Sequence, residues 1–284
     1  MAVSTWKTYQ RAQCVLLQFL KKYGFNASLP LSPSLVALFV TYLFEAIYAA
    51  STICTYVAAI NFTHKLSNLP EPGLAFVVQK AIQGAQKSKP KLDMRLPITK
   101  CILHKMVDAL EYCSTSGFQR VVYKSMFLLA FAAFLRVGEM TVSNGNTSNV
   151  LKREDVYFSP EGKNLIIIFR AYKHSGGRQK SIKIERTNCI YCPVKAFTEF
   201  LVLRKSFQSV FLFCWASGRP VQRVEFAKLL ESTVRFIGLD PQLYKGHSFR
   251  IGAACNAFNQ GCSDAQIRQL GRWRSDAFKA YIRV

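Results

Sequence analysis

Residues 164–185 read NLIIIFRAYKHSGGRQKSIKIE, and this stretch decides the fold because it is the clear β region of the sequence. Two isoleucine-rich runs, 164–170 and 179–185, flank a turn at 173–177 that contains two glycines. Such runs on both sides of a glycine-containing turn are typical of an antiparallel hairpin. The sequence therefore predicts a small antiparallel sheet whose hairpin carries five cations: Arg170, Lys173, Arg178, Lys180 and Lys183.

The segments around this hairpin have the periodicity of helices. Apolar residues recur at helical spacing through the first ninety residues, and no strand-like alternation interrupts them. Downstream of residue 98, helices are predicted at 99–113, 118–134, 193–205, 223–237, 246–259, 264–270 and 275–283. We therefore predict a mainly α-helical fold with a small antiparallel β-sheet. An all-helical domain would span 1–90, a basic linker 91–97, and a larger domain 98–284.

The charge of the chain predicts a polyanionic partner. The 284 residues include 38 Lys and Arg against 16 Asp and Glu, a formal net charge of +22, which is spread over both predicted domains. Nucleic acid is the common partner of such proteins, although charge that only keeps the protein soluble is an alternative. The basic segment 87–91, KSKPK, has two possible roles. Its lysines Lys87, Lys89 and Lys91 would face phosphates, or the segment is an ordinary solvated connector.

Several other classes of protein are disfavoured. The first residues lack the apolar run of a signal peptide, and the most apolar stretch, 126–135, is too short to cross a bilayer. Nine cysteines without framework spacing indicate reduced thiols in a cytosolic or nuclear setting. Cys189 and Cys192 have the spacing of half a zinc site, but no second pair matches it. No phosphate-binding glycine loop is present, and acidic residues are scattered, so we expect neither a metal nor a cofactor.

Four stretches of the second domain combine cations with groups suited to phosphate chemistry. An arginine follows the most apolar helix, with a carboxylate three residues later that can hold its guanidinium. A lysine lies in the hairpin turn, an HxxR motif opens a helix, and a tryptophan and a tyrosine lie near the end of the sequence. Each feature alone is weak, because solvated cations and packing aromatics are common. The set consists of Arg136, Glu139, Lys173, His247, Arg250, Trp273 and Tyr281.

In this order and spacing, the set resembles the tyrosine recombinases of the phage-integrase type. The segments GHSFR (246–250) and LGRWRSDAFKAYIR (270–283) look most like recombinases of eukaryotic Crypton and DIRS-like mobile elements. The resemblance covers essentially the whole chain. It implies a helical, SAM-like core-binding domain at 1–90 that binds DNA, followed by a tyrosine recombinase catalytic domain at 98–284.

The resemblance also implies a role for each residue of the set. Arg136 and Arg250 would bind the scissile phosphate, which two guanidiniums can stabilise without a metal. Tyr281 would be the nucleophile, His247 would assist proton transfer, and Lys173 would be the general acid. Trp273 takes the place where many members have a second histidine, and Glu139 would support Arg136. Arg170, Arg178 and Lys180 would bind DNA with the linker lysines.

The implied function is site-specific recombination or integration of double-stranded DNA through a covalent 3′-phosphotyrosyl intermediate. The phosphotyrosyl bond retains the energy of the phosphodiester, so rejoining needs no ATP. By resemblance, about four protomers would assemble on two DNA sites as a homotetramer, in the nucleus, with no membrane involved. Two alternatives remain open at this point: strand relaxation like that of a type IB topoisomerase, and a domesticated DNA-binding protein without catalysis.

Overall fold

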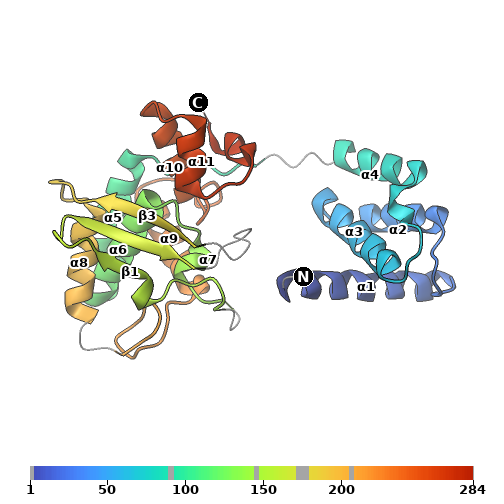
Figure 1. The fold of residues 1–284 in the computed structure, drawn as a ribbon, viewed down its shortest axis with the longest axis horizontal. Helices are drawn as coiled ribbons and strands as arrows, with labels where there is room; N and C mark the ends of the chain where they lie inside the picture. Colours follow the sequence, from blue (N-terminus) through green and yellow to red (C-terminus); the bar gives the residue numbers. More distant parts are fainter. Residues whose placement is uncertain (1–2, 89–92, 144–146, 171–178, 205–207, 284) are drawn as a thin grey trace. The chain divides into compact units, whose positions relative to one another are not determined.

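The computed structural model describes residues 3–88, 93–143, 147–170, 179–204 and 208–283 of the chain (Figure 1). The chain divides into two compact units, 1–93 and 94–284. As predicted, the described residues are mainly helical, with a small antiparallel sheet in the second unit. None of the helices in these ranges is long and apolar enough to cross a membrane.

The first unit is built from helices around one apolar core. Ser32 caps α2 by accepting a hydrogen bond from the backbone N–H of Leu35, and Pro33 occupies the first helical position, as this residue type favours. Phe39 and Leu43 of α2 are fully buried against the neighbouring helices. The buried His64 is hydrogen-bonded through both ring nitrogens, to Leu31 and Ile60, and so has a structural role. The elements are α1 (Val3–Tyr23), α2 (Pro33–Glu45), α3 (Ala50–Leu66), η1 (Pro72–Leu74) and α4 (Phe76–Ser88).

The second unit packs its helices around α6, the most apolar α-helix of this unit. Residues 126–131 of α6 are all buried, and this helix contacts α5, α8 and α10. α8 also contacts strand β3, so it links the central helix to the sheet. The helices are α5 (Lys100–Cys113), α6 (Gly117–Ala132), α7 (Val137–Met140), η2 (Arg153–Asp155), α8 (Pro193–Arg204), α9 (Arg223–Phe236), α10 (Ser248–Asn259), α11 (Asp264–Gly271) and η3 (Asp276–Tyr281).

The sheet has three antiparallel strands in the order β1–β2–β3. The predicted pairing is confirmed: β2 (Asn164–Phe169) and β3 (Lys180–Glu185) pair with Ile167 opposite Ile182. Alternate residues of both strands are buried, which is the pattern of a sheet with one face on the core. Strand β1 (Val156–Phe158) was not predicted, because three residues are too few to show an alternation.

Three predicted helices differ from the structure, two in a boundary and one in helix type. Each difference lies close to a candidate site residue. The helix predicted at 118–134 ends at Ala132, because Phe134 takes the left-handed conformation with φ of 51°. The helix predicted at 246–259 begins at Ser248, which leaves His247 as the residue that precedes it. The segment predicted as a helix at 275–283 is the 3₁₀ helix η3. Apolar periodicity does not encode where a turn must redirect the backbone.

Gly252 of α10 allows close approach of the segment that enters the second unit. The Ile98 N–H donates to the carbonyl of Ser248, and a Cβ at position 252 would overlap the Ile98 carbonyl oxygen. We expect Gly252→Ala to lower the free energy of unfolding of this unit by about 1–3 kcal/mol, as overpacking does. Gly117→Ala, at a glycine with open space, is the control in thermal and denaturant unfolding. An equal effect of both variants would contradict this expectation.

Candidate active site

His247 and Tyr281 meet although they are 34 residues apart in the sequence. The His247 Nε2 atom lies 2.6 Å from the Tyr281 hydroxyl oxygen, within hydrogen-bond distance. His247 immediately precedes α10, and Tyr281 is the last residue of η3, which packs against α10. Both side chains are half-buried. The imidazole can therefore exchange a proton with the phenol directly.

The segment that carries Tyr281 is held in place through its backbone. The Cys255 thiol donates to the Tyr281 carbonyl at 3.2 Å and accepts from the Arg283 N–H at 3.3 Å. Upstream, α11 ends at Gly271, and the next residue, Arg272, has a left-handed backbone (φ 57°) that reverses the chain direction. These contacts orient the phenol toward His247.

Arg250 lies beneath this pair and is completely buried. Its guanidinium donates to the Phe134 carbonyl at 2.6 Å and to the Gly271 carbonyl. Its Cζ lies 4.0 Å from the centre of the Trp273 ring, and that ring lies 5.3 Å from the ring of Tyr281. The Nε atom of Arg250 is buried without a hydrogen-bond partner. Arg250 therefore stacks on the tryptophan and retains one unused donor.

Glu139 connects Arg136 to a second, unpredicted arginine. Its carboxylate accepts from Arg136 Nη1 at 3.0 Å, from the Arg136 backbone N–H at 2.9 Å, and from Arg272 Nη2 at 2.7 Å. Arg272 is wholly buried, also donates to the carbonyls of Ala133 and Phe134, and lies over the Phe169 ring. One buried carboxylate thus fixes the guanidinium of Arg136, whose side chain is 29% exposed.

Arg136, Glu139, Arg250 and Arg272 form a cluster whose electrostatics favour an anion. Burial, together with the positive charges of Arg136 and Arg272, lowers the pKa of Arg250 to about 9. Glu139 is the acidic side chain that opposes this effect. Three guanidiniums around one carboxylate leave excess positive charge in a site of low dielectric. A bound phosphate would supply the missing negative charge.

The remaining predicted site residues either lie outside the described residues or take positions around the arginine cluster and elsewhere. Lys173, the predicted general acid, and Arg178, Lys89 and Lys91 lie outside the described residues. Lys87 is exposed at the end of α4. Arg170 forms ion pairs with Asp155 at 2.6 Å and Glu154 at 3.6 Å. Lys180 is half-buried, and its pKa is lowered by burial and by the charge of Arg272, so β3 places it near the cluster.

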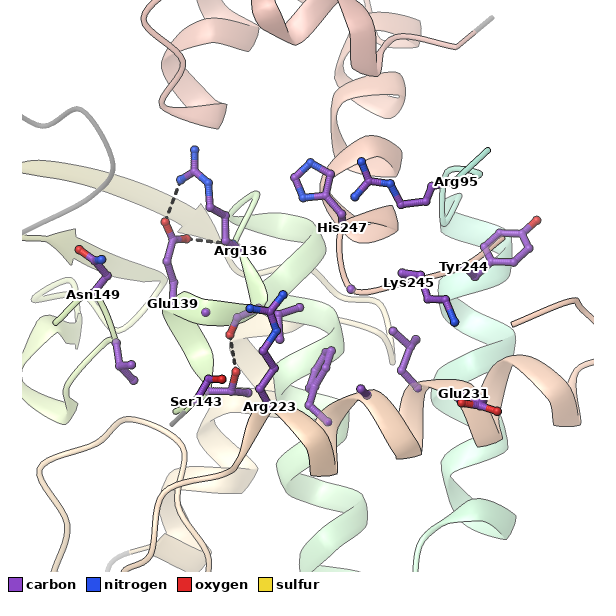
Figure 2. A pocket seen from close by; sticks show the side chains of 18 residues that line it. Arg95, Arg136, Glu139, Ser143, Asn149, Arg223, Glu231, Tyr244, Lys245 and His247 are labelled. Atoms are coloured by element: carbon purple, nitrogen blue, oxygen red, sulfur yellow. Dashed lines mark hydrogen bonds and ion pairs between the residues drawn. The ribbon is translucent and has the colours of Figure 1, made fainter. Parts of the chain in front are cut away.

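A hollow of about 580 Å³ opens beside the cluster (Figure 2). Arg136 and His247 line it, whereas Arg250, Trp273 and Tyr281 do not. Arg95, Arg223 and Lys245 add positive charge to the same lining. Sequence reasoning missed these three cations and Arg272. Lys245, two residues before His247, and Arg272, directly before Trp273, could have been suspected from these places, but Arg223 has no local signal that separates it from other arginines.

Comparisons with known proteins agree with this architecture, although no family model matches the sequence. The chain is 25% identical over 270 residues to the integrase/recombinase xerD homolog of Selenomonas ruminantium, covering 90% of the chain and 74% of that protein. The XerH site-specific recombinase, bound to a palindromic difH substrate, superposes with a TM-score of 0.68 at 14% identity over 97% of the chain and 75% of XerH.

The Tn1549 transposon integrase, in complex with transposon right end DNA, superposes with a TM-score of 0.69. It is 14% identical, and the match covers all of this chain and 90% of the integrase chain. The fold is therefore that of the tyrosine recombinases, a class of enzymes. The sequence similarity to the integrase/recombinase xerD homolog agrees with this fold.

Proposed function

We propose that this protein is a site-specific DNA recombinase that cleaves and rejoins strands through a covalent 3′-phosphotyrosyl intermediate on Tyr281. The observation that carries the proposal is the 2.6 Å contact between the Tyr281 hydroxyl and His247 Nε2, beside a cluster of three arginines. A nucleophile within hydrogen-bond reach of a base, next to cations that can stabilise a phosphorane-like charge, is the arrangement that phosphoryl transfer requires.

In the proposed step, the Tyr281 oxygen attacks the scissile phosphorus and its proton passes to His247 Nε2. The bond from phosphorus to the 5′-oxygen breaks as the bond to the tyrosine oxygen forms. The leaving oxygen takes a proton from a general acid, for which Lys173 remains the prediction. Rejoining is the reverse reaction with a 5′-hydroxyl as nucleophile, so the number of high-energy bonds is unchanged.

The two arginines would have different parts in this step. Arg136, partly exposed and held by Glu139, would contact a non-bridging oxygen directly. Arg250 is covered by Trp273, so contact with the phosphate requires the segment 271–281 to move away from the guanidinium. Its unused Nε donor and lowered pKa support an anion as its partner. A guanidinium aimed at developing charge accelerates such reactions by about 10²–10³-fold.

The wider biological setting is part of the proposal. The similarity to a transposon integrase supports an origin in a mobile element, and the resemblance of GHSFR and LGRWRSDAFKAYIR to Crypton and DIRS-like recombinases extends it to eukaryotic elements. Recombination of two duplexes would require about four protomers on DNA. The reaction would then take place in the nucleus.

A suicide substrate tests the chemistry. A duplex is first enriched from a randomised pool by binding, then nicked so that the cleaved fragment diffuses away. We expect a protein–DNA adduct that survives detergent, and peptide mapping should place the DNA on Tyr281. DNA binding without any adduct would support the non-catalytic alternative and overturn the proposal. Relaxation of a supercoiled plasmid without strand exchange between two sites would indicate the topoisomerase-like alternative.

A further inference from the structure

Arg223 and Lys245 are two of the three cations that line the hollow together with Arg136 and His247 (Figure 2). Neither has a role in the proposed chemistry. Arg223 is the first residue of α9, and Lys245 lies in the loop that leads to His247. Both side chains are exposed. Exposed cations are usually solvated, so their placement and their lack of partners decide whether they form a site.

The acidic residues of the hollow are already engaged by other cations. Glu139 is bound by Arg136 and Arg272, and Glu231 pairs with Arg235 at 2.8 Å. Within the described part of the chain, the side chains of Arg223 and Lys245 make no hydrogen bond or ion pair. The hollow therefore has two uncompensated positive charges in addition to the guanidinium of Arg136.

The backbone holds both cations at fixed places relative to Arg136. The Arg223 N–H donates to the Val142 carbonyl at 2.9 Å, just after α7. At the other end of α7, a Cβ on Gly246 would overlap the Val137 side chain, so the loop that carries Lys245 is pressed against the residue that follows Arg136. Because α7 is a single short helix, it anchors Arg136, Lys245 and Arg223 as one unit.

We propose that Arg223 and Lys245 bind the DNA phosphates that neighbour the scissile phosphate. This inference rests on the proposed function, which places the scissile phosphate at Arg136 and His247. The Cα atoms of Lys245 and His247 are at most about 7 Å apart, so their side chains can reach successive phosphates of one strand. A hollow of about 580 Å³ has the size of a small-ligand site and accommodates a short stretch of backbone, not a whole duplex.

Each such contact releases counterions, which makes it measurable through the salt dependence of binding. We would measure the affinity for the enriched duplex over a range of salt concentrations in the Tyr281→Phe background, where no cleavage interferes. Arg223→Gln and Lys245→Gln should each reduce the slope of log K against log salt by about 0.9. The same slope predicts about eightfold weaker binding for each variant near 0.1 M salt.

Lys228→Gln is the matched control, because Lys228 is an exposed cation on the same helix α9 that does not line the hollow. It should leave the slope close to that of the parent. With Tyr281 restored, single-turnover cleavage of saturating DNA by Lys228→Gln should equal that of the parent, because Lys228 does not line the hollow.

The outcomes separate this inference from the proposed function. Unchanged slopes in both variants, or an equal loss in Lys228→Gln, would overturn it even if the adduct forms on Tyr281. Reduced slopes in a protein that forms no adduct would support the phosphate contacts while the proposed chemistry fails. A deoxynucleoside monophosphate that binds the hollow as tightly as the duplex would show a small-molecule site and overturn the assignment to a DNA strand.

Discussion

Tyr281→Phe is expected to abolish the covalent protein–DNA adduct while DNA binding persists. The substitution removes the oxygen that would form the phosphotyrosyl bond. The ring that packs beside Trp273 is retained, so the site should keep its shape. The measurement is the fraction of labelled suicide substrate bound to protein after detergent, compared with the affinity of the same variant for an intact duplex.

A second tyrosine provides the control for this result. The Tyr191 hydroxyl donates to Asp108 at 2.8 Å, and Tyr191 does not line the hollow, so Tyr191→Phe also removes a bonded hydroxyl. We expect Tyr191→Phe to form the adduct as the parent does. Each variant should lose about 1 kcal/mol of stability from the missing hydrogen bond. An adduct that persists in Tyr281→Phe would assign the chemistry to another residue.

Glu139→Gln is expected to cause the largest loss of stability in the second unit. The carboxylate is 5% exposed and receives hydrogen bonds from Arg136 and the wholly buried Arg272. Removing its charge breaks the ion pair with the buried Arg272 guanidinium on one side, which costs about 3–5 kcal/mol for a buried pair. The measurement is the free energy of unfolding from denaturant titrations.

A double-mutant cycle shows whether this cost comes from the uncompensated charge. Adding Arg272→Met to Glu139→Gln removes the buried cation as well, and the double variant should recover part of the stability that Glu139→Gln loses. Glu231→Gln, which breaks the exposed pair with Arg235, should cost less than about 0.5 kcal/mol. Additive losses in the cycle would show that Glu139 and Arg272 do not stabilise each other.

The fold was predictable where local patterns carry the information. The isoleucine-rich runs at 164–170 and 179–185 around a glycine-containing turn predicted the paired strands, and the apolar run in α6 predicted the central helix. Strand β1 was not predictable, because its residues acquire their pairing from β2 and not from their own periodicity. The end of α6 was also missed, since the left-handed Phe134 is stabilised by what its carbonyl contacts rather than by its residue type.

The candidate site was predictable as a set of residues but not as an arrangement. Order and spacing singled out Arg136, His247, Arg250 and Tyr281, and the contacts of the structure bring all four into one cluster. Arg272 directly precedes Trp273, yet the sequence does not show that it shares Glu139 with Arg136. Arg223 and Lys245 were missed because a solvated cation and a ligand-binding cation have the same residue type, and only the tertiary structure shows that both line the hollow.

The sequence by itself determined the elements and the chemistry available to them, because periodicity, glycine turns and residue type act over a few neighbouring positions. Only the tertiary structure decided which side chains meet. The Phe134 carbonyl accepts from Arg250, 116 residues away, and from Arg272, 138 residues away. Two left-handed residues, Phe134 and Arg272, direct these contacts. Pairings over such separations depend on how the helices pack, and no local pattern encodes that packing.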